Sequence, residues 1–182
     1  MASNEVRIIG GLWRGRKIAF PDRPGLRPTL GRVRGTLFNW LRADVPGSRC
    51  LDLFAGSGAL GFEAASRGAA AVTLVESNRR VARSLADTAA RFDAGQVSVV
   101  CDQARRVLRR QIGTWDIIFL DPPFEGNNLA EVLREIREQG ALATEGLVYV
   151  EGSRHRPLPL EGWREVRRSQ AGDTQFGLLA AP

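Results

Sequence analysis

The sequence predicts an α/β protein with a doubly wound, mostly parallel sheet, preceded by an N-terminal β-hairpin and helix. From residue 49 onward, short β-prone runs alternate with helical patterns, as in a parallel sheet connected by helices. Runs such as 117–120 are apolar throughout, which is typical of parallel strands covered on both faces. The length of 182 residues suits one compact α/β domain and leaves no room for a separate substrate domain.

The N-terminal segment is predicted to form a hairpin followed by a helix. Residues 6–9 and 16–20 are β-prone, with glycine-containing turns between them. Trp13 lies among basic residues, so it suits either RNA contact or a small hairpin core. Thr29 is expected to cap the helix that follows. Apolar residues recur along that helix at three- and four-residue spacing: Leu30, Val33, Leu37 and Leu41.

The rest of the chain is predicted to complete a seven-stranded sheet. Strands are expected at 49–54, 71–76, 96–101, 115–120 and 146–151, and helices at 58–67, 78–92, 103–111 and 128–139. The last two β-prone runs, 163–169 and 174–180, have no helix after them and are expected to form an antiparallel hairpin at the sheet edge. These patterns divide the chain into a basic extension, 1–45, and an α/β domain, 46–182.

The basic charge is concentrated at the N-terminus. The chain has a formal net charge of +6, and residues 1–42 alone hold nine basic against two acidic side chains. Such a segment is typical of proteins that neutralise phosphates, so we predict nucleic acid as its partner, with a merely solvated surface as the alternative. The predicted RNA-binding residues are Arg7, Arg14, Arg16, Lys17, Arg27, Arg32 and Arg34.

Several classes of protein are excluded by composition. An apolar fraction of 43% and a charged fraction of 25% are ordinary for a globular protein and argue against disorder. No apolar run approaches a membrane span or a signal peptide, so a cytoplasmic location is expected. The two cysteines, Cys50 and Cys101, and the single His155 form no recognisable disulfide framework or metal site, and His155 is predicted to be non-catalytic.

Three of the predicted strands end in groups that suit a nucleoside ligand. Gly56 and Gly58, after the first strand, allow a tight turn and a close ligand approach, while Gly61 permits close helix packing. This G-x-G-x-x-G pattern is weak by itself and also suits NAD. Glu76, after the second strand, can accept ribose hydroxyls. Asp102, after the third, can accept an adenine amine or cap the next helix.

The fourth strand end favours a base with an exocyclic amine. Asp121, Pro122, Pro123 and Phe124 follow the apolar run directly. Two prolines remove two N–H donors, which leaves a rim of acceptors beside an aromatic side chain. Phe124 can stack on a flat base while Asp121 and the Pro122 carbonyl accept the two amine hydrogens. A rigid turn with Phe124 in the core is the structural alternative.

The motifs that carry a family resemblance span the chain. The segments Leu51–Gly58 and Asp121–Phe124 resemble class I S-adenosylmethionine-dependent methyltransferases that act on base amines. The segments 7–11, 14–15, 25–29, 32–34 and 37–41 resemble, more narrowly, the bacterial 16S rRNA guanine-N2 methyltransferase family, whose target is guanine 966. The chain departs from this family at Gly31 and Gly35, where acidic residues are usual, so any contact or cap those acids provide is in question.

The resemblance implies the cofactor, the substrate and the residues that hold them. S-adenosylmethionine would be bound by residues from all three of the first strand ends: Asp52, Phe54, Gly56, Ser57, Gly58, Glu76, Asp102 and Gln103. Asp121, Pro122 and Phe124 would hold the target guanine of 16S rRNA, most naturally within the assembled small subunit and with the enzyme as a monomer. An adenine-N6 methyltransferase shares cofactor and fold. An NAD-dependent oxidoreductase and a non-enzymatic RNA-binding module are more remote alternatives.

Overall fold

A computed structural model describes residues 3–24, 26, 29–110, 113–123 and 129–182. Its two-stranded sheet comprises β1 (Ser3–Arg7) and β2 (Lys17–Pro21). The larger sheet comprises β3 (Arg49–Asp52), β4 (Ala71–Val75), β5 (Val97–Val100), β6 (Trp115–Leu120), β7 (Leu142–Ser153), β8 (Arg164–Ala171) and β9 (Thr174–Ala180). The helices are α1 (Gly31–Trp40), α2 (Ala59–Ser66), α3 (Arg79–Arg91), α4 (Ala104–Arg109) and α5 (Leu129–Glu138).

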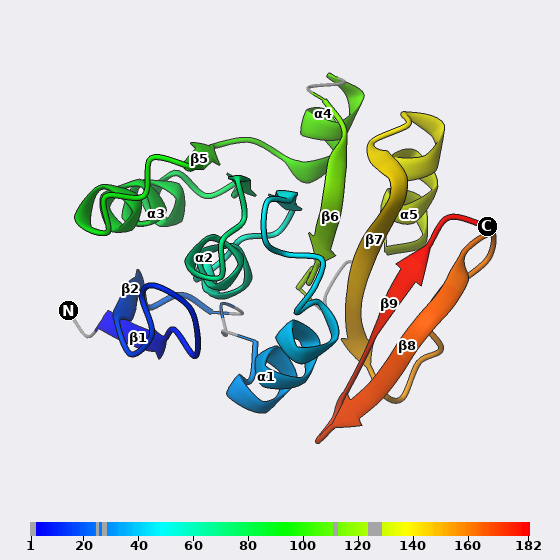
Figure 1. The fold of residues 1–182 in the computed structure, drawn as a ribbon, viewed down its shortest axis with the longest axis horizontal. Helices are drawn as coiled ribbons and strands as arrows, with labels where there is room; N and C mark the ends of the chain where they lie inside the picture. Colours follow the sequence, from blue (N-terminus) through cyan, green and yellow to red (C-terminus); the bar gives the residue numbers. More distant parts are fainter. Residues whose placement is uncertain (1–2, 25, 27–28, 111–112, 124–128) are drawn as a thin grey trace.

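The large sheet has the predicted doubly wound topology. Its strand order is β5-β4-β3-β6-β7-β9-β8, and β3 to β7 pair in parallel (Figure 1). The chain proceeds outward from β3 to β5 and then crosses back to β6, so the order reverses between β3 and β6. The final hairpin is antiparallel and lies at the edge, with β8 outermost. Ligands of such sheets bind beside the reversal, at the carboxyl ends of the strands.

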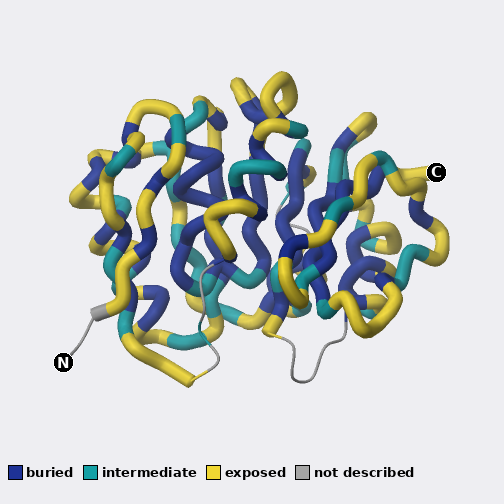
Figure 2. The backbone as a smooth tube through the Cα atoms, turned by 90° about the horizontal axis from the view of Figure 1, so that it is seen from below, coloured by how far each residue is buried: buried dark blue, intermediate teal, exposed yellow. Residues whose placement is uncertain are grey.

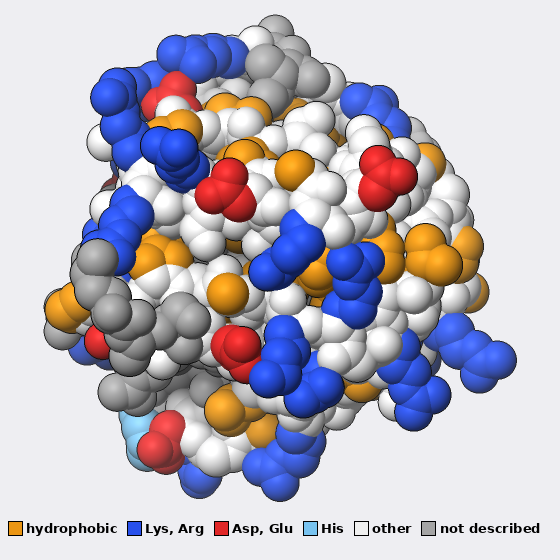
Figure 3. All heavy atoms as spheres, turned by 90° about the vertical axis from the view of Figure 1, so that its left-hand side faces the viewer, with side chains coloured by type: hydrophobic (Ala, Val, Ile, Leu, Met, Phe, Trp, Pro, Cys, Tyr) orange, Lys and Arg blue, Asp and Glu red, His pale blue; other side chains and the backbone are white. Residues whose placement is uncertain are grey.

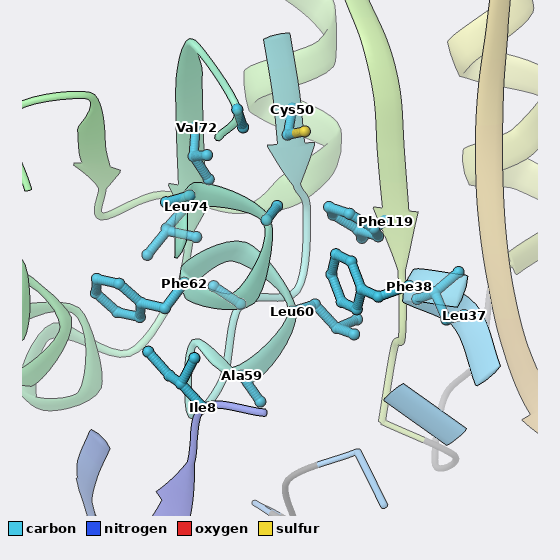
Figure 4. Close-up of a cluster of buried hydrophobic side chains, with 14 of the residues drawn as sticks. Ile8, Leu37, Phe38, Cys50, Ala59, Leu60, Phe62, Val72, Leu74 and Phe119 are labelled. Carbon is cyan, nitrogen blue, oxygen red and sulfur yellow. The ribbon is translucent and has the colours of Figure 1, made fainter. Parts of the chain in front are cut away.

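The helices cover the two faces of the sheet and create two apolar cores. One core joins the sheet to α1, α2 and α3, and Figure 4 shows Phe38, Phe62 and Phe119 packed within it. The other core joins the sheet to α4 and α5. Burial on both faces explains why residues 117–120 of β6 are apolar throughout, and Figure 2 shows buried backbone segments in the interior with exposed turns around them.

The N-terminal hairpin belongs to the first core and packs beside α2 and α3 (Figure 1). Trp13 is 4% exposed and its ring centroid lies 5.2 Å from that of Phe92, so Trp13 is a core residue and does not offer a face to RNA. The strand β1 ends at Arg7, two residues earlier than predicted. The reason is that the amides of Ile9 and Gly10 donate to the Glu63 carboxylate on α2.

The start of α1 differs from the sequence prediction. The residue at the N-cap position is Leu30, no side chain caps the helix, and its first turn holds no acidic residue. Thr29 is therefore not the cap, and its hydroxyl donates a hydrogen bond to Asp121 instead. The absence of an acid at Gly31 leaves the first turn of α1 without the negative charge that would favour the helix dipole, and Gly35 lies in the second turn.

Candidate active site at the carboxyl ends of the strands

The glycine loop turns sharply between β3 and α2. Gly58 occupies the N-cap position of α2 with φ of +80°, a conformation that costs other residues energy. A Cβ atom at Gly61 would lie 2.1 Å from Leu74 Cδ2, so this glycine lets α2 approach the sheet closely, as predicted. Within the loop Phe54 is half-buried, and the buried Ser57 accepts a long hydrogen bond of 3.4 Å from the Ala59 amide.

Asp52 ends β3 beneath this loop. Its side chain is buried, and Oδ2 accepts a hydrogen bond of 3.2 Å from the Gly61 amide. Oδ1 has no hydrogen-bond partner among the described residues. Burial, together with the negative charge of Asp121, raises the pKa of Asp52 to about 7. Asp52 therefore anchors α2 to the sheet and keeps one acceptor oxygen unused.

Glu76 connects the glycine loop to the start of α3. Its Oε2 accepts from the Gly56 amide at 3.2 Å, and its Oε1 accepts from the Asn78 amide at 2.7 Å. Arg23 Nη1 lies 3.9 Å from Oε1. The structure thus brings Gly56 and Glu76 together, as a nucleoside site at the ends of β3 and β4 requires. The carboxylate retains lone pairs for further donors.

Asp102 is held by the helix that follows it. Oδ1 lies 3.1 Å from Arg106 Nη1, and Oδ2 lies 2.9 Å from Arg110 Nη1. Asp102 is not the helix cap, because Gln103 occupies the N-cap position of α4 and its exposed side chain makes no capping bond. An adenine amine would have to share the Asp102 carboxylate with these two arginines.

Asp121 lies directly after β6, beside the reversal of strand order. Its Oδ2 accepts a hydrogen bond of 2.8 Å from the Thr29 hydroxyl. Burial raises the pKa of Asp121 to about 6, against the opposing effect of the Thr29 hydrogen bond. Pro122 is buried beside it, and Phe124 lies outside the described residues. An acidic side chain of this kind is half ionised near pH 6 and is an acceptor above it.

The sequence reasoning missed two polar residues of β7 at this site, Tyr149 and Glu151. Phe119 pairs with Tyr149 and Leu120 with Val150, so the next residues along each strand, Asp121 and Glu151, lie at the same level of the sheet. The Tyr149 hydroxyl donates to Glu151 Oε2 at 2.7 Å. Burial and the charge of Asp121 raise the pKa of Glu151 to about 8. The available signal was a carboxylate directly after an apolar run, the same signal that identified Asp121.

Most of the described members of the predicted RNA surface are exposed. Basic side chains outnumber acidic ones on the face that carries the hairpin (Figure 3). Arg16 packs over the Phe92 ring at 3.9 Å and Lys17 pairs with Glu5, so both are held by the protein itself. Neither Arg14 nor Arg32 forms a side-chain hydrogen bond or ion pair with a described residue. The exposed members are Arg7, Arg14, Arg16, Lys17 and Arg32.

Arg34 is the exception, and Arg27 lies outside the described residues. The Arg34 side chain is buried and its guanidinium contacts Glu63, the Thr29 carbonyl and the Arg7 carbonyl. The prediction that Arg34 binds RNA is therefore wrong for this conformation. The burial of Arg34 could have been predicted from the helical pattern, because Arg34 precedes the buried Leu37 and Phe38 by three and four residues and so shares their face.

Two features are absent from the residues that the structure describes. Among the described residues, no group of three or more His, Cys, Asp or Glu side chains is arranged to hold a metal ion. Within the same ranges, none of the helices has the length and apolar character needed to cross a membrane.

Comparison with known proteins identifies the family. Residues 6–180 match the family described as "Conserved hypothetical protein 95". The chain is 46% identical to Ribosomal RNA small subunit methyltransferase D of Escherichia coli K12, over 97% of this chain and 90% of that protein. It is 40% identical to the protein of the same name from Haemophilus influenzae, over 97% and 94%. The solved structure of the Escherichia coli protein yhhF superposes with a TM-score of 0.90 at 41% identity, covering 98% of each chain. The chain therefore belongs to the conserved hypothetical protein 95 family and has the fold of its methyltransferase relatives.

Proposed function

We propose that this protein is an rRNA methyltransferase that transfers a methyl group from S-adenosylmethionine to N2 of guanine 966 in 16S rRNA. Relatives named as small-subunit rRNA methyltransferases cover almost the whole chain. The observation that carries the proposal is the position of Asp121, a half-buried acceptor directly after β6 and beside the reversal of strand order, followed by the buried Pro122.

The residues at the first three strand ends suit the cofactor. Asp52 Oδ1 is a buried acceptor without a partner among the residues that the structure describes, which fits a ligand that brings its own N–H donors, such as the cofactor's amino group. Glu76 has lone pairs left for the ribose hydroxyls, and the backbone between β3 and α2 turns at Gly56 and Gly58. S-adenosylmethionine, when bound, supplies a methyl group on a positively charged sulfur. We assign Asp102 and Gln103 to the adenine end.

Asp121 and the Pro122 carbonyl are proposed to hold the guanine amine. The lone pair of this amine is conjugated with the ring and is therefore a poor nucleophile. Two hydrogen bonds to acceptors outside the ring plane turn the amine out of conjugation and aim the lone pair. Asp121 can then accept the proton that the amine loses, since the pKa of Asp121 is raised to about 6. Phe124 is assigned to stack on the base. Positioning supplies most of the catalysis.

The experiment that tests this function follows a labelled methyl group. S-adenosylmethionine with a labelled methyl is offered with unmodified small subunits, naked 16S rRNA, large-subunit rRNA and DNA, and nucleosides are then separated. We expect N2-methylguanosine from the small subunit, at a single position. Label in N6-methyladenine would overturn the choice of base, and no label in any substrate would overturn the function. The small-subunit and naked-rRNA arms also test our proposal that the assembled subunit is the substrate.

The exposed basic residues of the N-terminal segment are proposed to contact RNA phosphates. Because the hairpin is part of the core, its deletion would disrupt the fold, and single charges must be removed instead. The double variant Arg14→Gln/Arg32→Gln is expected to weaken RNA binding and to lower the slope of log K against log salt by about 1 for each lost phosphate contact. Binding titrations at several salt concentrations measure this slope.

A matched control removes the same charge from the opposite face of the sheet. Arg134→Gln/Arg137→Gln changes two arginines of α5 and should leave the salt slope unchanged. Equal slopes for both double variants would show that the N-terminal arginines do not bind phosphate. We further propose that the protein acts as a monomer in the cytoplasm, which sedimentation and fractionation can test.

A further inference from the structure

The hydroxyl of Thr29 forms a hydrogen bond with Asp121, the proposed catalytic residue, and does not cap helix α1. Thr29 is buried immediately before α1, and its Oγ1 lies 2.8 Å from Asp121 Oδ2 although the two residues are 92 positions apart. It leaves α1 without a side-chain cap. A threonine in a helix-start sequence is ordinarily used as a cap. Here that local bond is replaced by a long-range bond to Asp121.

The main chain of Thr29 is fixed by Arg34. Arg34 Nε donates to the Thr29 carbonyl at 3.2 Å, and Nη1 donates to the Arg7 carbonyl at 3.1 Å and to Glu63 Oε2 at 3.4 Å. Arg34 is 4% exposed and Glu63 is fully buried. A guanidinium held on three sides has little freedom, so Thr29 is presented to Asp121 from a rigid support.

Glu63 extends this support to the N-terminal hairpin. Its two oxygens accept from the amides of Ile9 and Gly10 at 2.9 and 2.8 Å, and Oε1 also pairs with Arg67. The turn that follows β1, helix α2 and, through Arg34, helix α1 therefore meet at one buried carboxylate. The same buried network connects the basic hairpin to the residue beside Asp121.

The bond from Thr29 has two consequences for Asp121. It occupies Oδ2 and fixes the rotation of the carboxylate, so that the other oxygen is left for a substrate donor. It also favours the ionised form and opposes the increase in the pKa of Asp121 that burial causes. Three other titratable groups face this carboxylate: Asp52 on β3, and Tyr149 and Glu151 on β7. The negative charge of Asp121 raises the pKa of each of them.

We propose that Thr29 is a positioning residue for methyl transfer: its hydroxyl orients the Asp121 carboxylate, and the buried Arg34–Glu63 pair holds Thr29 in place. This inference rests on the proposed role of Asp121. Thr29 itself touches neither cofactor nor RNA in the proposal.

The test compares Thr29→Val with Thr29→Ser. Valine has the shape of threonine without the hydroxyl, so kcat should fall about 10- to 100-fold, the loss expected for a hydrogen bond to a charged group. KM for the small subunit and the affinity for S-adenosylhomocysteine should stay near wild type. The acidic limb of the pH profile of kcat should move to higher pH, because the pKa of Asp121 rises without the bond. Thr29→Ser retains the hydroxyl and should restore both rate and profile.

Asp121→Ala, measured in parallel, distinguishes failure of the proposed role of Thr29 from failure of the proposed role of Asp121. If Asp121→Ala is inactive but Thr29→Val keeps the wild-type kcat and pH profile, the inference about Thr29 is overturned and the proposed function stands. If Asp121→Ala is active, the proposed function of that residue fails, and the role of Thr29 with it. Should Thr29→Val melt below the assay temperature, Thr29→Ala is assayed in the cold, where the displaced acidic limb is the deciding readout.

Discussion

Asp121→Ala is expected to lower kcat by about 10²- to 10³-fold, the usual effect of removing one group that a transition state needs. The alanine leaves the amine with one acceptor, so the lone pair is no longer aimed. Binding of S-adenosylhomocysteine should change little, because Asp52, Glu76 and the glycine loop are retained. Single-turnover methyl transfer to small subunits measures the rate, and calorimetry measures cofactor affinity.

A second variant at this position tests whether Asp121 accepts the proton that the amine loses. Asp121→Asn keeps one acceptor oxygen, which can face either Thr29 or the amine, and it cannot take the released proton at neutral pH. A slow enzyme whose rate no longer depends on pH near 6 would assign proton acceptance to Asp121. A rate for Asp121→Ala within threefold of wild type would disprove the role of Asp121, provided that both proteins show the same thermal unfolding.

Glu63→Ala is expected to cause the largest loss of stability of any single charge removal in the described residues, about 3–5 kcal/mol. The substitution leaves the buried Arg34 guanidinium without its countercharge and the amides of Ile9 and Gly10 without their acceptor. Unpaired buried donors carry the full cost of desolvation. Urea unfolding at pH 7 gives the free energy of unfolding directly.

The control for Glu63 is a glutamate that is exposed. Glu138 on α5 pairs with Arg134 at 3.6 Å, and both side chains are more than half exposed. Glu138→Ala should therefore change the free energy of unfolding little. The double variant Glu63→Ala/Arg34→Met should recover part of the loss, since it removes the stranded charge as well. Equal losses for Glu63→Ala and Glu138→Ala would contradict the structural role of the pair.

The fold and the general place of the site could be predicted from the sequence because both depend on local patterns. Helical and strand periods identify the elements, and groups that follow parallel strands meet at one edge of the sheet. This reasoning placed Glu76, Asp102 and Asp121 at that edge and predicted the close helix packing at Gly61, whereas Asp52 was assigned from the family resemblance. It would have placed Glu151 there too if the same rule had been applied to β7.

The sequence by itself determined the alternation of elements, the strand-end residues and the concentration of basic charge before residue 43. Only the tertiary structure decided which partner each buried polar group takes. Thr29 and Arg34 looked like a helix cap and an RNA contact, yet they support Asp121 through bonds to residues 92 and 29 positions away. A buried donor takes whichever acceptor the packed elements bring within about 3 Å, and that proximity is a property of the assembled fold.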